Sequence, residues 1–195
     1  MTIDPAALER LETQLRLDHD MPPRAYHNFS HVEDCLTKLD DVVDLDPRER
    51  SLLRLAILWH DSIYDPTRSD NEERSAARAV AELTKNGAAA KDAQEIGRLI
   101  QLTKGHQVAP GDRLGAILVS IDLSILGAEP ARYEAYARAI REEYRHVAEP
   151  LYRAGRKQVL AHFLAADPLY PHAPLDARYG AQARRNMAAE ASALG

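Results

Sequence analysis

Signals that begin a helix recur along this 195-residue chain. Some combine an N-cap aspartate with proline at the first helical position, and others have the Ser/Asp-x-x-Glu spacing of a capping box. Apolar residues then repeat at intervals of three and four, and Asn86-Gly87 is typical of a helix end. The starts are Asp4-Pro5, Ser30 with Glu33, Asp46-Pro47 with Glu49, and Asp70 with Glu73.

Periodic apolar runs continue through the second half of the chain. None of the sequence alternates apolar and polar residues as a half-buried strand does. The run 114–121 could be a buried strand by composition, but its helical neighbours favour a helix. We therefore expect an all-α, single-domain helical bundle. The later helices are expected near 91–103, 112–126, 130–146, 149–165 and 175–192.

The bulk properties exclude few functions. The formal net charge of -5 gives no electrostatic reason to bind a nucleic-acid backbone, so long nucleic acids are not expected as substrates. The single Cys35 cannot form an intramolecular disulfide, and its place on an apolar helix face predicts a small buried residue. Met1-Thr-Ile-Asp-Pro5 shows no signal peptide, and no segment reaches the ~20 apolar residues of a membrane span. We expect a cytoplasmic protein; its oligomeric state stays open, with a homo-oligomer possible.

Four polar residues stand out against this apolar background. His60 and Asp61 end the apolar run 55–61, His31 follows a predicted helix start, and Asp122 lies within the apolar run 114–127. Two imidazoles and two carboxylates from separate segments suit one divalent cation, with coordination positions left for water and substrate. The alternatives are a hydrogen-bonded core histidine at His60, and a hydrogen bond from a serine or an arginine to Asp122.

This pattern resembles the HD-domain superfamily of metal-dependent phosphohydrolases. More specifically, the stretches 26–32, 59–65, 70–76 and 122–127 resemble a family of small bacterial proteins described as HD phosphohydrolases, and the likeness extends to 152–160. The resemblance implies one HD-type domain over 1–195, with a metal-binding core at about 25–127 and a C-terminal helical extension at about 130–195.

The resemblance also implies a ligand set and a reaction. His31, His60, Asp61 and Asp122 would hold one divalent ion, which would polarise a phosphoryl oxygen and lower the pKa of an attacking water. Members with two ions have two further histidines between the His-Asp pair and the last aspartate, whereas only His106 lies between them here. Manganese is the expected ion; iron, zinc, cobalt, nickel and magnesium are alternatives.

Two further carboxylates are candidate catalytic residues. Asp65 follows Asp61 by four residues, and it either orients water or acts as a base, or it simply opens a turn. The related branch that hydrolyses guanosine tetraphosphate has an acidic pair after its His-Asp, but Tyr64 replaces the first acid here. Glu72 shares a helical face with Ala76 and should point inward, as a general acid or base, as a partner of a ligand histidine, or in an ion pair with an arginine.

Candidate substrate-binding residues are His27, Lys104, His106 and Arg156. His27 precedes His31 by one helical turn, Lys104 and His106 share a predicted turn, and the guanidinium of Arg156 suits a phosphate. The alternative for each is a solvated side chain without a role in binding.

These expectations together favour hydrolysis of a small phosphorylated molecule, with a nucleotide as the expected substrate. A non-catalytic HD module that senses a nucleotide or metal is the main alternative. An iron-dependent oxygenase is a third, but it needs ligands that this sequence lacks.

Overall fold

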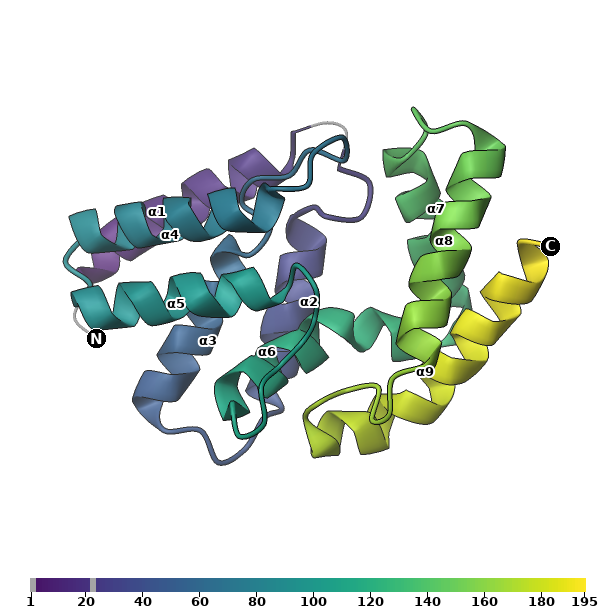
Figure 1. Cartoon of the computed structure of the whole chain (residues 1–195). Coiled ribbons are helices and arrows are strands. Elements are labelled where there is room, and N and C mark those ends of the chain that lie inside the picture. The colour runs from purple at the N-terminus through teal and green to yellow at the C-terminus, as the bar shows by residue number, and fades with distance from the viewer. Residues whose placement is uncertain (1–2, 22–23) are drawn as a thin grey trace. The chain divides into compact units, whose positions relative to one another are not determined.

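The computed structural model describes residues 3–21 and 24–195, and over these residues it is helical without a strand. The prediction that the N-terminus lacks a signal peptide concerns in part Met1 and Thr2, which lie outside the described residues. The prediction of an all-α fold is confirmed (Figure 1). The elements in chain order are α1 (Pro5–His19), α2 (Phe29–Asp40), α3 (Pro47–Trp59), α4 (Asn71–Lys85), α5 (Ala90–Leu102), α6 (Arg113–Asp122), the 3-10 helix η1 (Leu123–Gly127), α7 (Pro130–Glu143), α8 (Glu149–Leu164) and α9 (Ala173–Ala193).

The chain divides into two compact units, residues 1–118 and 119–195. The division falls within α6. One HD-type domain over 1–195, with a core at about 25–127 and an extension from about 130, stays a prediction.

Helix α3 is the centre of the first unit. Its residues 52–59 are buried except for Arg54, so nearly every face of this part of the helix is covered by protein. Helices α1, α2, α4 and α5 supply the cover. The chain leaves α3 directly into His60-Asp61, and the turn after a buried helix is therefore held in the interior.

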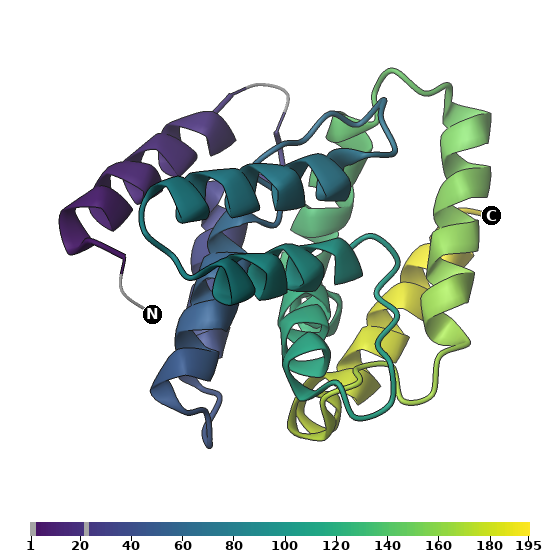
Figure 2. The same ribbon diagram turned by 60° about the vertical axis from the view of Figure 1, so that its left-hand side comes forward.

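Helices α4 and α5 run side by side on one side of α3 (Figure 2). A β-carbon at Gly97 of α5 would lie 2.7 Å from Val80 Cγ2 of α4, so this close approach depends on glycine. Helix α4 ends as predicted, at Asn86-Gly87, where Gly87 has a φ of 93°.

The caps follow the sequence in part. Asp4 accepts a hydrogen bond from the Ala6 amide, and Asp46 with Glu49 forms the predicted capping box. The box predicted at Ser30 is wrong, because Asn28 caps α2 by accepting from both the amide and the hydroxyl of Ser30. The box at Asp70 is also wrong, because its carboxylate pairs with Arg68 instead.

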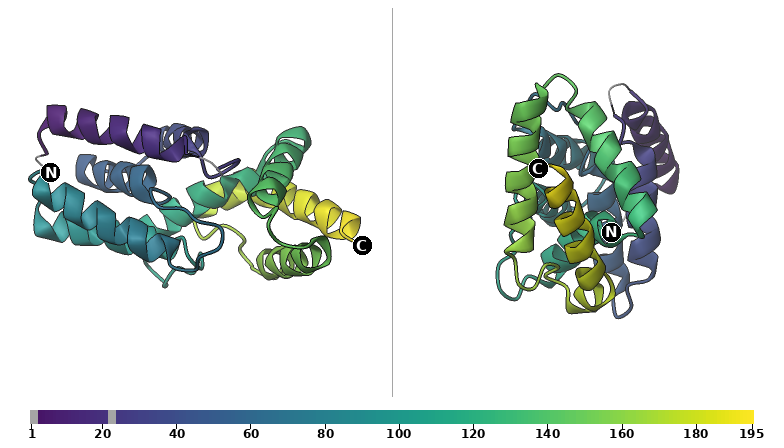
Figure 3. Two further views of the ribbon diagram at one scale, coloured as in Figure 1. Left: turned by 90° about the horizontal axis from the view of Figure 1, so that it is seen from above. Right: turned by 90° about the vertical axis from the view of Figure 1, so that its right-hand side faces the viewer.

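The second unit packs α8 against α9, and α7 and α9 against η1 (Figure 3). Asn186 of α9 donates to the carbonyls of Leu126 and Ala128, which satisfies the end of η1. A β-carbon at Gly127 would meet Tyr179 Cβ at 2.6 Å, so α9 lies directly against the backbone there.

Among the described helices, no single one is long and apolar enough to cross a membrane. One pair of helical segments has the length and composition of a span when the two are taken together: Arg113–Gly127 and Pro130–Glu143, with a bend of 103° between them. Buried core helices can meet the same requirement.

Candidate metal centre

His60 and Asp61 are placed by the end of α3. His60 is the C-cap residue and only 2% exposed, and the Ser62 amide closes the turn by donating to the Trp59 carbonyl. His60 Nδ1 lies 2.8 Å from the Ile57 carbonyl. A carbonyl can only accept, so Nδ1 carries a proton, and in the neutral ring it is Nε2 that presents a lone pair.

His31 is placed by the first turn of α2. It is the third residue of that helix and is 5% exposed, and its Nδ1 shares a hydrogen bond of 3.0 Å with the Tyr26 hydroxyl. A histidine ligand is commonly oriented in this way, through the ring nitrogen that does not face the ion. Nε2 of His31 is therefore the nitrogen that faces His60.

Three ligand atoms converge between these two segments. His31 Nε2 lies 3.1 Å from His60 Nε2 and 3.8 Å from Asp61 Oδ2, and His60 Nε2 lies 3.1 Å from Asp61 Oδ2. The circle through three points at these separations has a radius of about 2.0 Å, close to the ~2.0–2.2 Å between divalent metals and imidazole nitrogen or carboxylate oxygen. His31, His60 and Asp61 thus form a group that could hold a metal ion.

The charge state of Asp61 suits a cation. Burial favours its neutral form, but the charge and hydrogen bond of His60 in its protonated form, with the charges of His27 and His31, hold the pKa of the Asp61 carboxyl well below its usual value. Asp61 is therefore ionised at neutral pH. An ion bound at His60 Nε2 would take the place of that proton.

Asp122, the expected fourth ligand, is the last residue of α6 and belongs to the second unit, where it is half-buried. Its role as a ligand stays a prediction. Cys35 is buried as expected, one turn after His31, with Sγ 3.8 Å from His31 Nδ1.

The two candidate catalytic carboxylates have different surroundings. Asp65 accepts hydrogen bonds from the amide and hydroxyl of Thr67, at 2.9 and 2.7 Å, and these bonds lower the pKa of its carboxyl. The turn-opening alternative thus describes its present contacts. Glu72 is half-buried on the same face of α4 as Ala76, and it has no side-chain hydrogen bond or ion pair within the described part of the chain.

Among the candidate substrate-binding residues, His27 lies close to the ligand histidine His31. Its ring stacks on Tyr64 with 4.3 Å between ring centroids, its centroid is 6.2 Å from that of His31, and its charge acts on Asp61.

The other three candidates have different surroundings. Lys104 is exposed and pairs with Glu73. His106 is half-buried in the left-handed region, with a φ of 53°. Arg156 lies in the second unit, where it is buried and forms a bidentate pair with Glu190 at 2.8 and 3.0 Å. This pair gives Arg156 a structural role there, and its contact with substrate stays a prediction.

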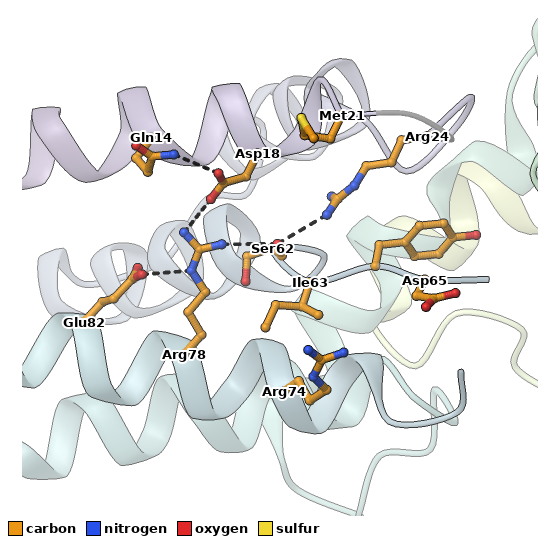
Figure 4. Close-up of a pocket in the computed structure, with 11 residues that line it drawn as sticks. Gln14, Asp18, Met21, Arg24, Ser62, Ile63, Asp65, Arg74, Arg78 and Glu82 are labelled. Carbon is orange, nitrogen blue, oxygen red and sulfur yellow. Dashed lines mark hydrogen bonds and ion pairs between the residues drawn. The ribbon is translucent and has the colours of Figure 1, made fainter. Parts of the chain in front are cut away.

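A cleft of about 590 Å³ lies in the first unit beside the turn that follows Asp61 (Figure 4). The three ligand candidates are not among its lining residues within the described chain. Its lining includes Arg24, Ser62, Tyr64, Asp65, Arg74 and Arg78.

Two residues at the centre were missed from the sequence, Arg24 and Tyr26. Arg24 donates to the Asp61 carbonyl at 2.6 Å, and Tyr26 bonds to His31. Tyr26 stands five residues before His31, which is a signal for proximity but not for a role.

No protein-family model, curated protein or solved structure matches this chain.

Proposed function

We propose that this protein is a metal-dependent phosphohydrolase of the HD type that acts on a small phosphorylated molecule, with a nucleotide as the favoured substrate. The observation that carries the proposal is the convergence of His31 Nε2, His60 Nε2 and Asp61 Oδ2 within 3.8 Å of one another. The resemblance of the surrounding sequence to HD proteins supplies the reaction class, and the cytoplasm is its expected location.

The residues present fit one divalent ion of the first transition row. Two neutral imidazoles and an ionised carboxylate are the donors that manganese, iron and zinc accept, and Asp122 would bring a second carboxylate and near charge balance. Such an ion would act as a Lewis acid on the phosphoryl group and would lower the pKa of a water. Manganese is the proposed working ion.

The chain's own residues would orient the reactants and handle protons. His60 keeps its proton on Nδ1 because of the Ile57 carbonyl, and its Nε2 stays directed at His31 and Asp61. Glu72 is the proposed group for proton transfer, since Asp65 already accepts two hydrogen bonds from Thr67. His27 is the proposed contact for a substrate phosphate.

The test is product release from a panel of nucleotides and phosphorylated metabolites with added Mn²⁺, followed by both phosphate and the dephosphorylated product. We expect turnover by the wild-type protein and none by Asp61→Ala. Asp167→Ala is the control, because Asp167 has a 95% exposed side chain in the second unit.

The outcomes separate the alternatives. Equal turnover by wild type and Asp61→Ala would refute the metal mechanism. Thermal stabilisation by a nucleotide without product, in a protein that binds Mn²⁺, would indicate a sensing module instead.

A further inference from the structure

Arg24 joins the two segments that carry the converging ligand atoms. Its guanidinium donates to the carbonyls of Asp61 at 2.6 Å and Ser62 at 3.3 Å, and to the carbonyl of His27 at 3.4 Å. The first two carbonyls belong to the turn that presents His60 and Asp61, and the third lies four residues before His31. One side chain thus bonds to both sides of the centre.

The carbonyls of the turn after α3 accept from side chains of other segments, that of Asp61 from Arg24 and that of Ser62 from Arg24 and Arg78. Carbonyls at and beyond the end of a helix lack partners within the helix, and an arginine there also complements the negative end of the helix dipole. Because Arg24 is itself half-buried, its bonds replace contacts with water and fix the turn in one position.

A second guanidinium holds the other side of the same turn. Arg78 donates to the Ser62 carbonyl at 3.3 Å, and it is oriented by Asp18 at 2.5 Å and Glu82 at 2.8 Å (Figure 4). Glu82 also accepts from Trp59 Nε1 at 2.9 Å. The carbonyl of Ser62 is therefore held between a fixed Arg78 and Arg24, which leaves Arg24 as the link toward α2.

We propose that Arg24 is a positioning residue for the metal centre, which acts through the backbone of Asp61 and Ser62 to set the separation of His31 from His60 and Asp61. This inference rests on the proposed function, because it assumes that these three side chains hold an ion. Arg24 points its donors at backbone carbonyls and works without touching the ion.

Positioning and plain electrostatics predict opposite results for Arg24→Ala. Removing a positive charge near a cation site strengthens cation binding if charge alone matters. Loss of positioning weakens it, by about 10–100-fold for groups that orient metal ligands. Arg24→Lys retains the charge but cannot reproduce the fork of donors, so positioning predicts weaker binding in this variant as well.

Arg50 provides a matched control. It is half-buried like Arg24 and donates to two backbone carbonyls, Leu39 at 3.0 Å and Val42 at 2.7 Å, near the opposite end of α3. Arg50→Ala therefore removes a similar set of bonds from the same unit without touching the turn after Asp61.

The experiment measures the affinity for Mn²⁺ by calorimetry and the visible absorption of the Co²⁺-loaded protein, which reports ligand geometry. We expect Arg24→Ala and Arg24→Lys to bind Mn²⁺ at least tenfold more weakly with a changed Co²⁺ spectrum, and Arg50→Ala to match the wild type. Millimolar guanidinium ion should partly restore Arg24→Ala. The fluorescence of Trp59, the single tryptophan, verifies that each variant is folded.

Three results would overturn the inference. Unchanged or tighter binding by Arg24→Ala excludes positioning while leaving the metal centre intact. Equal weakening by Arg50→Ala assigns the effect to general stability. A folded wild-type protein that binds neither ion refutes the proposed function and the role of Arg24 with it.

Discussion

Acidification should destabilise the first unit through His19, a buried histidine at the end of α1. His19 is 0% exposed, its Nδ1 lies 2.7 Å from the Leu15 carbonyl, and its Nε2 has no partner in the described structure. Burial lowers the pKa of His19 from 6.5 to about 4, with a smaller contribution in the same direction from the charge of Arg24.

The sign and size follow from proton linkage. Because the pKa of His19 is lower in the folded state, the unfolded chain binds more protons between pH 6.5 and pH 4. The contribution is therefore complete above pH 6.5 and is lost as the pH falls toward 4. A difference of this size amounts to about 3 kcal/mol of unfolding free energy at pH 4.

The assay is urea unfolding followed by Trp59 fluorescence, with a chelator present, at pH values from 7.5 to 4. Trp59 is buried in the first unit, so its emission reports that unit. We predict that the unfolding free energy of the wild type falls by about 3 kcal/mol more than that of His19→Leu over this pH range. His162→Leu, at an exposed position on α8, should follow the wild type. If the unfolding free energy of wild type and of His19→Leu fell by the same amount between pH 7.5 and pH 4, the reasoning would be refuted.

Other predictions concern stability elsewhere. Glu190→Ala leaves buried Arg156 without its carboxylate and should cost about 3–5 kcal/mol in urea unfolding followed by circular dichroism. Glu134→Ala, which removes one exposed carboxylate, should change the same quantity by less than about 0.5 kcal/mol; equal effects of the two would contradict this account. Gly87→Ala should destabilise the protein by about 1 kcal/mol, because an alanine at a φ of 93° is strained. Gly155→Ala, on α8, should stabilise it by up to about 1 kcal/mol, since a β-carbon there meets nothing within 4 Å. If both glycine variants changed the unfolding free energy in the same direction, these two predictions would be refuted.

Local chemistry made much of the fold predictable. Asp46, Pro47 and Glu49 act within one helical turn, so the start of α3 could be read from sequence. The run 112–126 was expected as one helix, yet it changes to a 3-10 helix after Asp122. That change accompanies contacts of η1 with α9, from residues some 60 positions away, which no local pattern contains.

Part of the candidate centre was also predictable from local sequence, because its ligand residues can be recognised by their chemistry and spacing. His31, His60 and Asp61 are chemically distinctive, and apolar periodicity directed His60 inward. Arg24 was not predictable, because the backbone carbonyls to which it donates have no sequence signature. Arg156 was considered for phosphate binding, whereas its partner Glu190 comes from another helix and was visible only in the fold.

The most direct test of the central claim is Mn²⁺ binding by equilibrium dialysis of the wild-type protein and Asp61→Asn. Asparagine retains the shape of the side chain but removes the charge that faces His60. We predict a saturable stoichiometry near one ion per chain for the wild type and a loss of affinity of more than about tenfold for the variant. Absence of saturable binding by the wild type, or equal binding by the two proteins, would contradict the claim, and a stoichiometry near two would refute a single-ion centre.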